Sequence, residues 1–394
     1  MEIPPLFLGI LLASLTGGIL WVREKYKSSA LFRWVPAPFF CYFFPLCLTS
    51  IGLLPSVSPL YDGVARFLLP VCLALLLLNV NFAALRGVGR SALLAMAWGV
   101  GGMVAGLVVS FGFFHSFLPP EAWKSVGALA GSWTGGSANL LAVKEALGAS
   151  EQVFAPILVV DTLFAYSWMA FLVWMAGRQG AVDRWSKAWE RDVLPVPPLL
   201  KTKTPSWPWP TVPMAALVLA GGSLFLGTTL GPTWSRAVAE ILPDLGNSLK
   251  PATWTVIAVT TGSLVASLSG RFRALPERTE GVGTFFLFFL LTTLGAQASF
   301  RSLKEAPLFL AVGAVGLMIH GATLVVGARL SRLPLALLAT ASQACVGGVV
   351  SAPLVGAVYR SSLAAVGLLL AVLGNVGGTY VGLLTAHLCS WIGN

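Results

Sequence analysis

Apolar residues occupy most of the chain in long runs that short polar stretches interrupt. A helix needs roughly 20 apolar residues to cross the hydrocarbon core of a bilayer. Runs of about that length lie at 5–22, 37–54, 63–80, 91–114, 123–146, 153–176, 211–230, 251–269, 281–299, 306–328, 333–358 and 361–390. The pattern therefore predicts an all-α, multi-pass transmembrane bundle of about 11–13 helices.

One long polar stretch divides these segments into two groups of six. It carries cations from Arg178 to Lys203, and it ends in a proline-rich part that cannot continue a helix. We therefore expect a first transmembrane repeat at 1–176, a linker at 177–210 and a second transmembrane repeat at 211–394.

The fifth segment of each group is interrupted by a pair of glycines among polar residues. Lipid offers no hydrogen bonds to an opened helix, so such a backbone must line protein or a polar cavity. Matching interruptions in two halves indicate the binding site of a secondary transporter, although small residues also allow helices to pack closely. The candidate substrate and helix-break residues are Ser132, Thr134, Gly135, Gly136, Gln343, Gly347, Gly348 and Ser351.

Asp161 is the sharpest candidate for ion binding, because a carboxylate deep inside an apolar run is costly and marks a functional site by default. Asn375 follows Gly348 at about the spacing by which Asp161 follows Gly136. Carboxylate, amide and hydroxyl oxygens suit Na⁺, and protons would compete at the carboxylate. The candidate ion ligands are Asp161, Thr162, Asn375, Ser137 and Asn139. The alternative is a structural carboxylate that is hydrogen-bonded to Thr162 or to a neighbouring helix.

Gln297 and His320 are second-tier candidates. Gln297 equally fits an amide at a helix end near the interface, and a lone intramembrane histidine more often bonds a neighbouring helix than relays protons. Lys144 and Glu145 end the first interrupted segment, and we expect them at the membrane interface.

Composition supports a membrane protein, since 56% of the residues are hydrophobic and only 10% are charged. The net charge of +10 comes from cations between apolar runs, which favours a role in membrane orientation over nucleic-acid binding. Cations at Arg23–Arg33 and in the linker both favour the cytoplasm, yet five crossings separate them. One segment is therefore re-entrant or interfacial, or the linker hides a crossing.

Motifs of enzymes and cofactors are absent from the sequence. It contains no GxSxG, HExxH or Walker loop, and its five cysteines form neither a CxxC pair nor a zinc-type spacing. We therefore expect no enzyme activity, no disulfide, no cofactor and no metal apart from Na⁺ as a coupling ion.

Five stretches carry a resemblance to a known family, and they are Gly131–Leu147, Asp161–Thr162, Gly295–Phe300, Ala341–Ala352 and Leu373–Tyr380. Together they resemble the DUF819 family of uncharacterised polytopic proteins, over nearly the whole chain. The resemblance implies kinship with cation/proton antiporters and bile-acid sodium symporters, which combine a core of crossed, broken helices with a panel domain and move like an elevator. It also implies an ion-binding role for Asp161. The sequence departs from the family at Ser299, where the family commonly has an acidic residue, and in the second broken helix, which is usually richer in Asn and Thr.

The expected function is secondary active transport of a small solute in the cytoplasmic (inner) membrane. Half-helices that restart near Ser137 and Val349 present partly positive ends, which favour an anionic solute, while the opposing C-terminal ends attract cations. The sequence leaves open which substrate is carried. It also leaves open whether the coupling ion is Na⁺ or H⁺ and whether the transport is symport or antiport. The expected partners are the lipid bilayer and the solute, without nucleic acid, and a homodimer is compatible. The alternative is a passive channel or structural membrane subunit.

Overall fold

The computed structural model describes residues 3–26, 29, 37–78, 88–188, 211–241, 251–268, 277–298, 300, 304, 306–360 and 362–393. Over these ranges the chain forms α-helices and one short 3₁₀ helix, with no strand. The predicted all-α fold is thus confirmed. Of the expected linker, the described part holds helix α9 (Gln179–Ser186), while 189–210 lies outside the described residues, as does Ser299.

Six described helices are long and apolar enough to cross a membrane, which confirms a multi-pass membrane protein. Two further helices form a pair bent by 53° that adds a seventh span if counted as one. The long helices are α1 (Pro5–Lys25), α4 (Pro59–Leu78), α6 with its 3₁₀ extension (Arg90–Phe117), α8 (Glu151–Ala176), α15 (Ala306–Ser331) and α18 (Leu363–Gly393). The others are α3 (Ala37–Ser50), α7 (Ala122–Leu147), α10 (Thr211–Thr229), α11 (Gly231–Ile241), α13 (Pro251–Leu268), α14 (Glu277–Gln297), α16 (Leu335–Val346) and α17 (Gly348–Tyr359).

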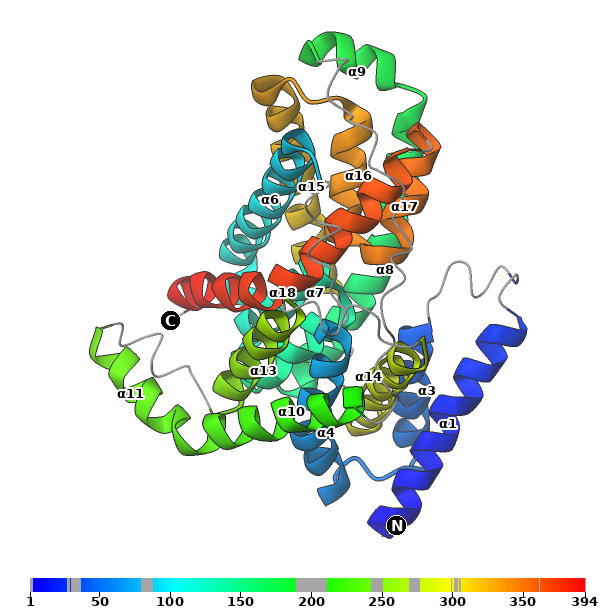
Figure 1. The fold of residues 1–394 in the computed structure, drawn as a ribbon, viewed down its shortest axis with the longest axis vertical. Helices are drawn as coiled ribbons and strands as arrows, with labels where there is room; N and C mark the ends of the chain where they lie inside the picture. The colour runs from blue at the N-terminus through cyan, green and yellow to red at the C-terminus, as the bar shows by residue number, and fades with distance from the viewer. Residues whose placement is uncertain are drawn as a thin grey trace. The chain divides into compact units, whose positions relative to one another are not determined.

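Figure 1 shows the helices in chain order. By their contacts they group into two compact units, labelled here unit 1 and unit 2. Unit 1 comprises Met1–Val80, Leu141–Thr162 and Thr204–Pro307, and unit 2 comprises Asn81–Leu140, Leu163–Lys203 and Leu308–Asn394. Each unit draws helices from both halves of the sequence. The units are therefore a different division from the expected repeats, whose boundaries stay a prediction.

Unit 1 is joined by small residues and hydroxyl groups, which drive helix association where lipid supplies no hydrophobic force. Helix α3 packs on α14 so closely that a Cβ atom on Gly295 would collide with the Tyr42 carbonyl oxygen. The Thr16 hydroxyl bonds Thr292 Oγ1 at 2.8 Å and joins α1 to α14. The Thr49 hydroxyl donates to Ala296 O at 2.8 Å.

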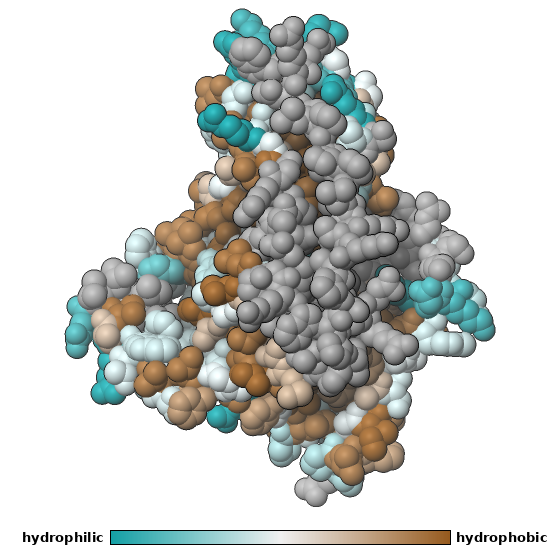
Figure 2. Space-filling view, in the orientation of Figure 1, coloured by the Kyte–Doolittle hydropathy of each residue, from teal (hydrophilic) through white to brown (hydrophobic). Residues whose placement is uncertain are grey.

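Unit 2 is held by the same kind of contact. A Cβ atom on Gly106 of α6 would collide with the Gly316 carbonyl oxygen of α15, and the Ser110 hydroxyl donates to Val312 O at 2.7 Å. At one end of the unit, Asp183 of α9 accepts a hydrogen bond from Leu335 N at 2.7 Å and caps α16. Figure 2 shows hydrophilic residues gathered at the end where Figure 1 places α9.

Candidate functional site

Helix α7 is interrupted at Gly136, whose φ of 78° and ψ of −178° are not helical. A positive φ of this size is readily adopted only by glycine. The interruption expected from the glycine pair is therefore present at the predicted residue.

After the interruption, α7 doubles back along α18. Before the break, Gly127 packs on Ala386 and Thr134 packs on Gly374, so α7 runs from the C-terminal part of α18 towards its middle. After the break, Asn139 bonds Asn375 O and Thr379, which both follow Gly374 on α18. Helix α7 is thus a hairpin with its tip at Gly136, rather than a straight crossing.

Amide groups form the polar centre of this tip. Asn139 is 3% exposed, donates to Gly135 O and to Asn375 O (3.3 Å), and accepts from the Thr379 hydroxyl (2.6 Å). With the Asn375 amide turned so that its nitrogen faces the neighbouring acceptors, this nitrogen donates to Gly135 O at 2.9 Å. Two predicted ion ligands, Asn139 and Asn375, therefore lie in one network.

Glycines also bring the two backbones into contact at this place. A Cβ atom on Gly374 would collide with the Thr134 carbonyl oxygen, and one on Gly378 would lie 2.7 Å from Gly135 Cα. Close packing is therefore one role of these residues. Thr134 Oγ1 is buried and has no hydrogen-bond partner within the described part of the chain.

The second interrupted segment is a hairpin as well, made of α16 and α17. Gly347 ends α16, and Gly348 opens α17 with a φ of 73°. Ala339 and Val355 share a hydrophobic cluster with Leu172 of α8, which two halves of a straight helix could not do. Figure 1 shows the two helices side by side.

Both ends of the second hairpin lie at the α9 end of unit 2. The α16 end is capped by Asp183, and the Tyr359 hydroxyl at the α17 end donates to Leu172 O at 2.6 Å. The run 333–358, counted above among the membrane-length segments, therefore enters and leaves on one side. Its interruption was predicted, but its direction was not.

Gln343 connects the tip of this hairpin to α8. Its side chain is fully buried, and Nε2 donates to Ser351 Oγ (2.9 Å) and to Ala165 O (3.4 Å). Its Oε1 atom is buried without a hydrogen-bond partner in the described residues. Gln343 and Ser351, two predicted substrate residues, are thus in direct contact across the break.

Met96 of α6 touches both hairpin regions. Its sulfur lies 3.6 Å from Cys345 Sγ near the second tip, and its Cε atom lies 3.3 Å from where a Cβ atom on Gly374 would stand. Gly356 at the end of α17 packs on the Leu363 backbone at the start of α18, whereas α7 begins beside the end of α18. The two hairpins therefore enter unit 2 from opposite ends and meet the same region.

The remaining ion-binding and helix-break candidates lie on α8 and α7. Asp161 and Thr162 are partly exposed on α8 and belong to unit 1, with Asp161 one helical turn before Ala165. Ser132 of α7 is buried, and Ser137 just after the break is partly exposed. Whether Asp161 and these α7 residues share a site stays a prediction.

His320 is fully buried and bonded at both ring nitrogens. Nδ1 lies 2.9 Å from Gly99 O, and Nε2 lies 2.8 Å from Ser342 Oγ, which also accepts from Trp168 Nε1 at 2.8 Å. Because a carbonyl oxygen only accepts, Nδ1 carries the proton and the Ser342 hydroxyl donates to Nε2. This matches the predicted bond to a neighbouring helix. Gln297 donates to Thr293 O at 3.3 Å.

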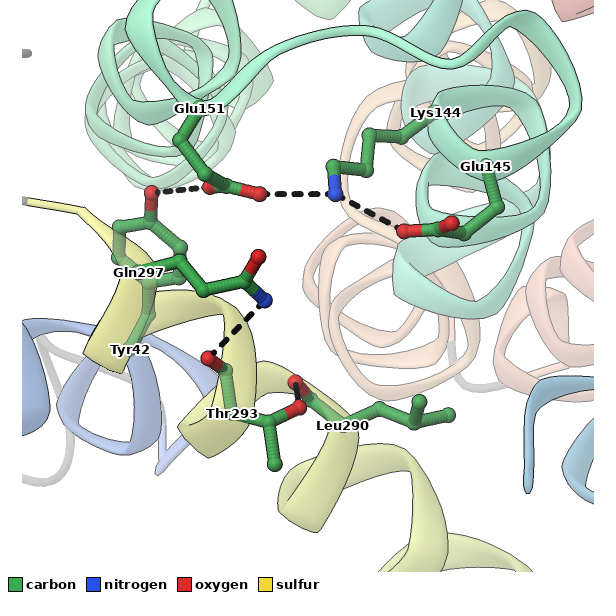
Figure 3. A network of polar contacts seen from close by, with 7 residues as sticks. All are labelled: Tyr42, Lys144, Glu145, Glu151, Leu290, Thr293 and Gln297. Atoms are coloured by element: carbon green, nitrogen blue, oxygen red, sulfur yellow. Dashed lines mark hydrogen bonds and ion pairs between the residues drawn. The ribbon is translucent and has the colours of Figure 1, made fainter. Parts of the chain in front are cut away.

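Unit 1 contains a charged network that sequence reasoning missed (Figure 3). Lys144, with a side chain 8% exposed, bonds Glu145 at 2.8 Å and Glu151 at 2.7 Å, and the Tyr42 hydroxyl donates to Glu151 at 3.0 Å. The network ties the turn between α7 and α8 to α3. Lys144 is thus enclosed by protein, although we had expected it at the interface. Part of the signal was present in the sequence, since two glutamates, Glu145 and Glu151, follow Lys144 closely.

All five cysteines are free thiols in the structure. No group of three or more histidine, cysteine or acidic residues suitable for a metal occurs among the residues that the structure covers.

Comparison with known proteins gives two matches. A family model described as "Protein of unknown function (DUF819)" matches residues 10–392. A protein of Bacillus subtilis (strain 168), described as "Uncharacterized membrane protein YjcL", is 22% identical over 342 residues, which cover 86% of this chain and 85% of that protein. Neither description assigns an activity.

Proposed function

This chain belongs to the DUF819 family, and we propose that it is a secondary active transporter that couples a small anionic solute to Na⁺ or H⁺. The proposed binding region is where the two hairpin tips of unit 2 meet α18 and α8. No catalytic residue or resident cofactor is part of the proposal.

The observation that carries the proposal is the pair of opposed hairpins with interrupted tips. Non-helical backbone inside a membrane protein is tolerated only where it is buried in protein or lines a polar cavity. Among the described residues, Thr134 Oγ1 and Gln343 Oε1 have no hydrogen-bond partner although they are buried near the tips, and an unsatisfied buried polar atom costs about 1–3 kcal/mol. A bound solute or ion would supply the missing hydrogen bonds.

The helices that form unit 2 support an inverted repeat. From the first half the unit takes α6, part of α7 and the end of α8, and from the second half it takes α15, α16–α17 and α18. Each set is a long helix, a hairpin and a long helix, and the hairpins enter from opposite ends. This order is expected if two inverted repeats each contribute their last three segments to a mobile core, as an elevator-like mechanism requires.

Helix ends at the second tip support an anionic solute. Helix α17 begins at Gly348 with no side-chain cap and no acidic residue in its first turn, so its N-terminal N–H groups are open to an anion. The C-terminal end of α16 lies at the same tip and favours a cation. Such a pair of ends suits an anion that binds together with its coupling ion.

Asp161 is the proposed coupling carboxylate, because it lies ten residues into α8, well inside a membrane-length helix. We expect Asp161→Asn to abolish stabilisation by Na⁺ and to flatten the pH dependence of transport, since the amide neither ionises nor binds a proton. Thermal midpoints in NaCl and in choline chloride measure the first effect. Asp62→Asn, an exposed carboxylate of α4, is the control and should keep the wild-type response. A wild-type Na⁺ response in Asp161→Asn would show that Asp161 is structural.

The deciding experiment is uptake by the purified protein in liposomes. Under an imposed Na⁺ or pH gradient we expect saturable accumulation of a carboxylate from a broad metabolite panel, competed by other carboxylates and not by amines. A double variant, Thr134→Val with Gln343→Leu, should lower uptake at least tenfold if these atoms bind the solute. Absence of gradient-driven uptake over the whole panel would refute the proposal.

The tight glycine contacts of Gly374 and Gly378 favour a second candidate, in which the interrupted segments only pack helices. The chain would then be a passive channel or a structural subunit of a membrane assembly. Flux that does not saturate with solute concentration identifies a channel, and a partner that co-purifies at fixed stoichiometry identifies a structural subunit.

A further inference from the structure

A recess of about 610 Å³ opens at the α9 end of unit 2, between the start of α6 and the turn that joins α15 to α16. Its lining has a polar part, made of Arg90, Ser91, Ser331 and Arg332, and an apolar part. Neither the hairpin tips nor the residues assigned above to solute or ion binding contribute to it. The recess is therefore separate from the proposed transport site.

The polar part carries two cations and no acidic side chain. Arg90 is the first residue of α6 and Arg332 lies in the α15–α16 turn, and both are exposed. Ser331, next to Arg332 in the sequence, also lines the recess, and its hydroxyl accepts a hydrogen bond from Trp98 Nε1 at 2.9 Å, which leaves the hydroxyl proton to donate to another acceptor. Guanidinium and hydroxyl donors of this kind match the oxygens of a phosphate group.

The backbone adds to this positive field. Helix α6 begins after Gly89 with no side-chain cap and no acidic residue in its first turn. Its first N–H groups and the helix dipole therefore favour an anion at the recess. The neighbouring N-terminus of α16, in contrast, is already capped by Asp183.

The apolar part lies on the outer face of a membrane-length helix. Leu93 and Leu94 of α6 are each 43% exposed, and Ala97 follows them one turn later. A small soluble anion would leave these exposed leucine side chains uncovered, whereas the acyl chain of a lipid would cover them. The ligand is thus expected to be amphipathic, with an anionic head and an apolar tail.

The charges near this end of unit 2 indicate which leaflet the recess faces. Arg178, Arg184 and Lys187 belong to or flank α9, and Arg329 lies in the last turn of α15, while Asp183 caps α16. Such an excess of cations favours the cytoplasmic side. Anionic lipids of the cytoplasmic leaflet bind basic pockets between transmembrane helices.

We propose that this recess binds an anionic phospholipid of the cytoplasmic leaflet, with its phosphate at Arg90 and Arg332 and an acyl chain along Leu93 and Leu94. The bound lipid would connect the start of α6 to the α15–α16 turn, two parts of unit 2 that are far apart in the sequence. The proposal does not depend on which solute the protein transports.

The test is lipid retention by the purified full chain, followed by native mass spectrometry and by thermal midpoints. Phosphatidylglycerol, phosphatidylcholine and glycerol phosphate are added separately. We expect phosphatidylglycerol to bind at least tenfold more tightly than phosphatidylcholine, and Arg90→Gln with Arg332→Gln to remove that preference. Arg23→Gln with Arg236→Gln, which removes the same charge from unit 1, is the matched control and should retain it.

The double variant Arg90→Lys with Arg332→Lys is a control for misfolding. It keeps both charges and should bind phosphatidylglycerol with intermediate strength. Equal retention of phosphatidylglycerol by wild type and the Arg→Gln double variant would overturn the proposal. Equal stabilisation by glycerol phosphate would show a soluble phosphate site instead of a lipid site, and equal binding of phosphatidylcholine would show an apolar contact without headgroup recognition.

Discussion

Buried polar side chains of unit 2 fall into two classes by the number of hydrogen bonds that they make. His320 uses both ring nitrogens, and Ser342 serves both His320 and Trp168, so these residues are fully bonded within the protein. Thr134 and Gln343 each have a buried side-chain oxygen that bonds no other residue in the part of the chain that the structure describes. Because a fully bonded network has no capacity left for a ligand, the first class is structural, and the second is where a ligand would bind.

Ser342→Ala tests the structural class. The change leaves the Trp168 indole N–H and His320 Nε2 without their shared partner, so we expect a loss of about 1–3 kcal/mol in stability. Apparent thermal midpoints in detergent, compared at one scan rate, measure it. Ser167→Ala is the matched control, since the exposed Ser167 hydroxyl bonds only carbonyl groups of its own helix. Equal midpoints for the two variants would contradict the assignment.

At the level of helices, the sequence was sufficient to predict the interruptions and insufficient to predict the hairpins. A glycine pair among polar residues weakens a helix wherever it occurs, so Gly136 and Gly348 could be found from local pattern. The direction after the break depends on contacts such as Asn139 with Thr379, 240 residues away, which no local pattern contains. The Lys144 network was missed for a similar reason, because Tyr42 completes it from another helix.

Gly348→Ala tests whether the second tip needs its backbone conformation. No atom lies within 4 Å of a Cβ atom on Gly348, so the only cost is the φ of 73°, about 1–2 kcal/mol for a residue other than glycine. We expect a lower thermal midpoint and a larger loss of transport, because the hairpin would bend differently. Gly18→Ala on α1 is the control, since it also meets no atom within 4 Å and should leave stability unchanged or raise it. A midpoint of Gly348→Ala equal to that of the control would rule out strain at this residue.

For the whole molecule, the hairpin of α7 removes the conflict between the positive-inside signals. Arg23 and Lys25 end α1, and Arg178 and Lys187 flank α9. With α7 re-entrant, the apolar helices between these groups in the described part of the chain are the candidate spans α4, α6 and α8 and the shorter α3, which is an even number of crossings when α3 also crosses. Both groups can then lie on the same side of the membrane, which agrees with the positive-inside signals.

Single cysteines in a background with the five native cysteines replaced by alanine test this topology. Tyr26→Cys and Lys187→Cys should react with a membrane-impermeant maleimide only in inside-out vesicles, because both positions follow cation-rich helix ends. Glu121→Cys should react only in intact cells, since Glu121 precedes α7 and thus lies at the end of unit 2 opposite α9. Each variant is first shown to keep the thermal midpoint of the background protein. Labelling of positions 26 and 187 from opposite faces would mean that an odd number of helices crosses between them, and α7 would then have to span the membrane.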